Sequence, residues 1–242
     1  MGEISGIYIV ILLIFIIISI ILAVCGIYGR SFMHSRNIES VMTLLGLAQI
    51  GDPSLNGHSV AMRYLIATFY DFLPLDYRLG ISRNDIIYAA LFLDIGKLGI
   101  PSNIRNKAGK LTAGERTIMT RYPEVSVELL KDLPGFNKTE KWIRYYRERV
   151  DGTGKYKLKG NEIPVASRML AIVDTYSSIT MPRPYKAQSD HEEAISQLSL
   201  AAGTQFDEAL VKIFCDIPPS RIKTCMDKVE ETNKRIIALY QL

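Results

Sequence analysis

Charge is almost absent from the start of this 242-residue sequence, and cysteine and histidine are scarce throughout. Glu3 is the only charged residue before Arg30, and residues 4–29 are nearly all apolar. The three cysteines suggest neither a disulfide framework nor a zinc motif, which is consistent with a reducing compartment. The apolar run argues against a wholly soluble protein, and the apolar content of the remainder argues against general disorder.

Residues 4–29 are long enough to cross a membrane, because a helix of that length spans roughly 39 Å and the bilayer core is about 30 Å thick. A cleaved signal peptide fits less well, since the run is long and no basic residue precedes it. Arg30 and Arg36 follow the run, so the positive-inside rule predicts a single-pass inner-membrane protein with its C-terminal domain in the cytoplasm. We expect residues 30–51 to form a stalk helix and residues 52–242 to form the domain.

The net charge of the chain is only +4, with 29 basic and 25 acidic residues. This balance lacks the concentrated basic stripe that nucleic-acid binding requires. We therefore expect no nucleic-acid partner, and the slight positive charge suits the anionic inner leaflet of a membrane.

Helical periodicity dominates the rest of the sequence, and no segment shows the two-residue alternation that is typical of strands. Two capping patterns, Ser82 with Asp85 and Thr112 with Glu115, predict helix starts. The expected helices cover about residues 35–50, 54–72, 82–96, 112–131, 139–149, 164–180 and 220–240, and another begins at Ser189. The sequence therefore predicts an all-α domain.

Short polar phrases accompany the apolar segments. One of them, Leu93-Asp94-Ile95-Gly96-Lys97, places Asp94 and Lys97 on one face of a helix. Taken alone, it reads as an ion pair at a helix end. The other phrases, in chain order, are His58-Ser59-Val60-Ala61, Glu148 to Gly154, Ile163-Pro164, Arg168 to Asp174, Arg183-Pro184-Tyr185-Lys186 and Ala202 to Asp207. Their order over about residues 52–214 resembles the HD-GYP family, a branch of the HD metal-dependent phosphohydrolases.

This resemblance implies a helical bundle that carries two or three metal ions and hydrolyses cyclic di-GMP, a bacterial second messenger. It assigns His58, Asp94 and Asp174 to the metal ligands. From the residues alone, His58 reads equally well as an ordinary histidine at a helix start.

The resemblance also assigns three basic residues, Lys97, Arg183 and Lys186, to the ligand's phosphate groups. Arg183 and Lys186 are three residues apart, so one face of a turn can present both to a phosphate. The alternative is that they are solvated surface charges.

Four positions at which the family has a histidine hold other residues here, namely Leu93, Tyr122, Tyr146 and Arg147. Leucine has no donor atom, a neutral tyrosine is a poor ligand, and arginine repels a cation. The family's Gly-Tyr-Pro phrase reads Gly154-Lys155-Tyr156. The sequence therefore predicts a degenerate HD-GYP domain, and a pseudoenzyme rather than an enzyme.

The remaining ligands, His58, Asp94 and Asp174, suffice for at most one weakly held divalent metal, Mn or Fe, and we expect no cofactor. A hypothesis for the metal-free site is that Arg147, alone or with Lys97, neutralises the two aspartates through ion pairs. The reason is that buried carboxylates without a cation are costly.

These observations predict a membrane-anchored, catalytically inactive protein in a bacterial signalling, motility or envelope assembly. It would act as a scaffold or interaction subunit, with protein partners, or as a cyclic di-GMP receptor. The alternative is a residual single-metal phosphodiesterase that uses Asp94, Lys97 and Asp174. A third reading is a purely structural subunit, in which the loop at Lys155 and Lys157 contacts a partner protein.

Overall fold

The computed structural model describes residues 16–19, 38–46, 57–107, 109–133, 135–181 and 190–240. The chain divides into two compact units, Met1–Ser40 and Val41–Leu242. No helix in these described ranges is both long and apolar enough to cross a membrane. Apart from the helical residues 16–19, the predicted span at 4–29 lies outside the described residues, so the anchor stays a prediction.

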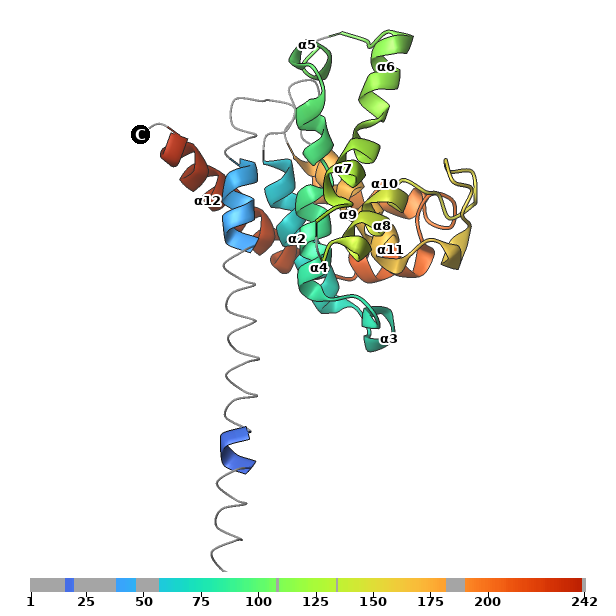
Figure 1. Ribbon diagram of the computed structural model, residues 1–242. Coiled ribbons are helices and arrows are strands. Elements are labelled where there is room, and N and C mark those ends of the chain that lie inside the picture. Colours follow the sequence, from blue (N-terminus) through green and yellow to red (C-terminus); the bar gives the residue numbers. More distant parts are fainter. Residues whose placement is uncertain are drawn as a thin grey trace, which may run out of the picture. The chain divides into compact units, whose positions relative to one another are not determined.

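The larger unit is built from helices, as the sequence predicts, and Figure 1 shows α3 at one end of it and α5 and α6 at the other. Within the described residues the only β-type pairing outside the helices is an isolated bridge between Ala202 and Phe206. The elements are α2 (His58–Phe72), α3 (Leu75–Arg78), α4 (Arg83–Phe92), η1 (Ile95–Gly99), α5 (Ser102–Arg105), α6 (Ala113–Thr120), α7 (Tyr122–Leu130), α8 (Asn137–Tyr145), η2 (Gly160–Glu162), α9 (Val165–Thr180), α10 (His191–Leu200), α11 (Glu208–Cys215) and α12 (Pro219–Tyr240).

Helix α2 lies at the centre of the core, since it packs against α4, α9 and α12. Its apolar side chains are buried along most of its length, including Leu65, Ile66 and Phe69. Phe69 meets Phe214 edge to face, with ring centroids 5.1 Å apart. Each such fully buried side chain contributes about 1.5–3 kcal/mol of transfer free energy, which fixes α2 and the residue at its start.

The capping signals place helix starts correctly. Ser82 caps α4, and Thr112 forms a complete capping box with Glu115 at the start of α6. Helix α10 starts at His191, with Asp190 as its N-cap, while the predicted start at Ser189 lies outside the described residues.

The single helix expected over residues 112–131 is in fact two helices, α6 and α7. The break falls at Arg121, which ends α6 and precedes α7. Pro123 explains it, because proline has no N–H for the helical ladder and its ring clashes with the preceding turn. The short helices α3, α5 and α11 were not predicted.

The predicted stalk, residues 30–51, is described only over the helix 38–46. The end of this helix belongs to the larger unit, which starts at Val41. A Cβ atom on Gly46 would come within 2.4 Å of the side chain of Ile236 in α12, so the two helices touch there. The compact unit therefore starts before residue 52, where the sequence placed the domain boundary.

Candidate functional site

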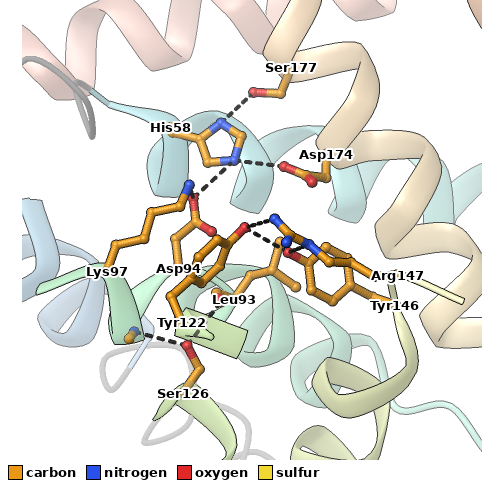
Figure 2. Close-up of polar contacts among 11 residues, drawn as sticks. His58, Leu93, Asp94, Lys97, Tyr122, Ser126, Tyr146, Arg147, Asp174 and Ser177 are labelled. Carbon is orange, nitrogen blue, oxygen red and sulfur yellow. Dashed lines mark hydrogen bonds and ion pairs between the residues drawn. The ribbon is translucent and has the colours of Figure 1, made fainter. Parts of the chain in front are cut away.

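His58 is a bridge between two acidic residues that are distant in the sequence (Figure 2). It is the first residue of α2, and its Nε2 atom lies 3.0 Å from Asp174 Oδ1 and 3.4 Å from Asp94 Oδ2. Its Nδ1 atom lies 3.0 Å from Ser177 Oγ. Asp174 and Ser177 are three residues apart on α9, so one face of that helix holds both sides of the imidazole ring.

Asp94 is the most deeply buried charge of the site, with 1% of the residue exposed. It follows the end of α4 and precedes η1, and Lys97 Nζ lies 2.5 Å from its Oδ2 atom. Burial would raise the pKa of Asp94, but Lys97 and His58 outweigh burial and lower that pKa to about 2. The carboxyl group is therefore ionised, and the expected contact of Lys97 with it is present.

The second oxygen of Asp94, Oδ1, is buried and has no hydrogen-bond partner by distance and angle among the described residues. The Tyr122 hydroxyl nevertheless helps to lower the pKa of this carboxyl group. Asp94 thus keeps one oxygen that can accept a stronger donor or a cation.

Two tyrosines and an arginine form a second polar cluster beside the carboxylates (Figure 2). The hydroxyl oxygens of Tyr122 and Tyr146 are 2.8 Å apart. Arg147 donates from Nε to Tyr146 at 2.8 Å and from Nη2 to Tyr122 at 2.5 Å. Within the described part of the chain Arg147 forms no ion pair with Asp94 or Asp174, which differs from the hypothesis that it neutralises them directly.

The pKa values of both phenols lie well above the ordinary value of 10.0, because the side chains are buried. Nearby carboxylates raise the pKa values further. Tyr122 and Tyr146 are therefore neutral at physiological pH. A neutral phenol is a weak donor to a metal ion, so these positions supply no anionic ligand.

Tyr122 also lies against two cations. The centre of its ring is 4.6 Å from Lys97 Nζ and 4.6 Å from Arg147 Cζ. Both distances are in the range of cation–π contacts. The fixed positive charges of the site are thus an ammonium and a guanidinium held around one aromatic ring.

The turn that carries Asp94 is fastened to α7 through a serine. Ser126 Oγ donates to the carbonyl oxygen of Leu93 at 3.0 Å and accepts from the Gly96 N–H at 2.9 Å. The two elements approach so closely that a Cβ atom on Gly96 would meet the Tyr122 carbonyl oxygen at 2.1 Å. The Leu93 side chain is buried in the core, where it has no polar role.

Glu148 organises the loop that resembles the family's Gly-Tyr-Pro segment. Its two carboxylate oxygens accept the backbone N–H groups of Tyr156 and Leu158. Gly154 packs so tightly on this carboxylate that a Cβ atom there would lie 2.6 Å from Oε1. Glu148 is therefore a structural residue of this loop.

A cleft of about 300 Å³ lies beside Asp174, which is one of the residues that line it. Its lining includes Arg147, Asp174, Thr175 and Gln205, from the turn after α8, from α9 and from the segment before α11. Of the three predicted phosphate contacts, Lys97 lies at the carboxylates, whereas Arg183 and Lys186 lie outside the described residues.

Comparison with known proteins shows the family and the fold of this chain. The sequence profile of the HD domain matches residues 44–210, so the chain belongs to the HD domain family. A probable cyclic di-GMP phosphodiesterase of Vibrio cholerae is 31% identical over 72% of this chain. A cyclic di-GMP phosphodiesterase of the same species is 27% identical over 72% of this chain.

This chain spans only 43% and 38% of the length of those two relatives. Among solved structures, an HDG"Y"P protein from Bdellovibrio bacteriovorus superposes with a TM-score of 0.54 at 15% identity. That superposition covers 76% of this chain and 63% of the other, and it shows a shared fold.

Four of the predicted site residues, His58, Asp94, Lys97 and Asp174, are neighbours in the structure. It missed the serines, Ser126 and Ser177. Ser177 had a signal, because it lies three residues after Asp174 on a predicted helix. Ser126 had none, since its partners are more than 25 residues away in the chain.

Among the described residues, no group of three or more His, Cys, Asp or Glu side chains is arranged to hold a metal ion. His58, Asp94 and Asp174 lie together, but one oxygen of Asp94 is already taken by Lys97. Metal binding at these three residues stays a prediction.

Proposed function

We propose that this protein is a membrane-anchored, catalytically inactive member of the HD-GYP superfamily that works by binding. The observation that carries the proposal is the cluster of Tyr122, Tyr146 and Arg147 at positions assigned to histidine ligands. Two neutral phenols and a guanidinium do not fit a two-metal centre, because such a centre needs anionic or imidazole donors around both ions.

The proposed ligand is cyclic di-GMP, held by Lys97, Arg183 and Lys186. Support comes from the two relatives, which are named as cyclic di-GMP phosphodiesterases, and from the retained Lys97. The cleft beside Asp174 offers room next to the site. A protein partner in a signalling, motility or envelope assembly would then sense the bound state.

The proposed location is the inner membrane, with residues 4–29 as anchor and the helical unit in the cytoplasm. This rests on the uncharged run and on Arg30 and Arg36 after it.

A residual phosphodiesterase is the second candidate function. It is favoured by the short distances from His58 Nε2 to two carboxylates and by the unpaired Oδ1 atom of Asp94. In this reading one metal ion would bind to His58, Asp94 and Asp174, and would supply the charge that activates water.

The metal content of the purified protein distinguishes the inactive binding protein from the residual phosphodiesterase. The full chain, purified in detergent, is exposed to excess Mn²⁺ or Fe²⁺, desalted and analysed for metal, and cyclic di-GMP hydrolysis is then measured. We expect no retained ion and no turnover. An ion retained by the wild type and lost in Asp94→Ala, together with turnover that this variant abolishes, would overturn the inactive assignment.

A further inference from the structure

A second cleft, of about 290 Å³, lies between the start of α7, the end of α8 and the loop at Lys155. Its walls share Tyr146, Arg147 and Glu148 with the Asp174 cleft but include neither Asp174 nor any residue of α9. The charged side chains that line it are Arg121, Glu124, Arg144, Arg147, Glu148 and Lys155.

Basic groups outnumber acidic ones in this cleft, and the acidic ones are largely engaged. Both carboxylate oxygens of Glu148 accept hydrogen bonds from backbone N–H groups. Glu124 uses Oε1 for an ion pair with Lys155, and Arg144 is bonded to Glu140 outside the cleft lining. The surplus of positive charge therefore belongs to Arg121 and Arg147.

Both arginines have N–H groups that form no hydrogen bond within the described residues. Among the described residues the Arg121 side chain makes no hydrogen bond or ion pair, and Arg147 uses Nε and Nη2 for the tyrosines but leaves Nη1 unbonded. Glu124 raises the pKa of Lys155, and Arg121 opposes this effect, as expected for a guanidinium close to the ammonium. Guanidinium groups with open N–H bonds are the preferred partners of phosphate.

The cleft also offers one acceptor. Glu124 Oε2 is buried and has no hydrogen-bond partner by distance and angle within the described residues, although the Glu124 backbone N–H helps to lower the pKa of this carboxyl group. Leaving a buried carboxylate oxygen unpaired is costly, so a ligand that donates to it gains affinity. A bare anion satisfies the arginines but not Glu124.

We propose that this cleft binds a small phosphorylated molecule that carries a hydroxyl or N–H group near its phosphate. The phosphate lies at Arg121 and at Nη1 of Arg147, and the neighbouring donor group points to Oε2 of Glu124. This site goes beyond the proposed function, since its residues are not the ones assigned to cyclic di-GMP.

Calorimetric titration of the full chain in detergent tests the site, with ribose 5-phosphate and inorganic phosphate as probes. We expect saturable binding of ribose 5-phosphate, and weaker binding of inorganic phosphate. Arg121→Gln should raise the dissociation constant for ribose 5-phosphate about tenfold, as expected for one lost charge-assisted contact. Arg116→Gln is the matched control, because Arg116 is an exposed arginine on α6 outside the cleft, and it should change nothing.

Three results would overturn the proposal. The first is no saturable binding by the wild type. The second is an equal effect of Arg121→Gln and Arg116→Gln, which would indicate non-specific attraction. The third is a loss of binding in Lys97→Gln or Arg183→Gln while Arg121→Gln binds normally, and this result would leave the proposed cyclic di-GMP site standing. Equal affinity for the two probes would refute the role of Glu124.

Discussion

Tyr122 is the residue around which the charges of the site are arranged. Its ring contacts Lys97 and Arg147, and its hydroxyl group contacts Arg147 and Tyr146. A buried phenol costs free energy unless its oxygen is paired, and here the guanidinium supplies the donor. Arg147 therefore contributes to the stability of this region as well as to its positive charge.

Arg147→Ala should destabilise the fold by about 1–3 kcal/mol, because two buried phenol oxygens lose a charged donor. The free energy of unfolding in urea measures this. Arg116→Ala, at an exposed position on α6, is the control and should have little effect. An unchanged free energy in Arg147→Ala would show that the tyrosine pair is stable without the arginine.

Asp94 should make stability fall in acid. Its folded-state pKa of about 2 lies below the ordinary value of 3.8, so its contribution is present above about pH 4 and is lost as the pH falls toward 2. The shift corresponds to a contribution on the order of 2 kcal/mol. Free energies of unfolding at pH 5 and pH 2.5 should differ less in Asp94→Asn than in the wild type. Identical pH dependence in both proteins would contradict the assignment.

At the scale of elements, the position of the site depends on the contact of η1 with α7. Gly96, which lies in η1 at this contact, has no side chain, so the η1 backbone can approach the α7 backbone closely. Capping patterns and periodicity predicted the helices α4, α6 and α9 from sequence, since those signals are local. The contact itself was not predictable, because it joins Gly96 to residues of a helix that the sequence had merged with its neighbour.

Gly96→Ala should destabilise the protein by at least 1–3 kcal/mol, roughly the cost of overpacking, since the new methyl group meets backbone rather than a flexible side chain. Gly99→Ala lies in the same short helix, and its nearest neighbour would be Val125 Cγ1 at 3.9 Å, so it should be tolerated. Thermal unfolding of the two variants makes the comparison. A similar loss in both variants would mean that the close approach of η1 to α7 does not decide the outcome.

At the scale of the whole molecule, helical periodicity and one resemblance predicted the fold class, and the structure confirms an all-α HD domain fold. His58, Asp94 and Asp174 could be named because they belong to phrases in a known order. The tyrosine and arginine cluster could not, because absent ligands do not reveal what their replacements bind. Only the folded chain places Tyr122 and Tyr146 within hydrogen-bonding distance.

The anchor prediction also belongs to this scale. The full chain should remain in the membrane fraction after alkaline carbonate washing, whereas a chain that starts at Arg30 should not. Immunoblotting of both fractions is the measurement. Release of the full chain by carbonate would show that residues 4–29 do not span a bilayer.

The hydrogen-bonded set of Tyr122, Tyr146 and Arg147 also constrains how this sequence can change in evolution. Replacing Arg147 alone by histidine takes the donor from both phenols, and replacing Tyr122 alone leaves a guanidinium facing an imidazole. Each single substitution toward histidine at these positions is therefore expected to lose stability before any metal affinity is gained. Because the three side chains depend on one another, a change to histidine at these positions is expected to need several substitutions together rather than one at a time.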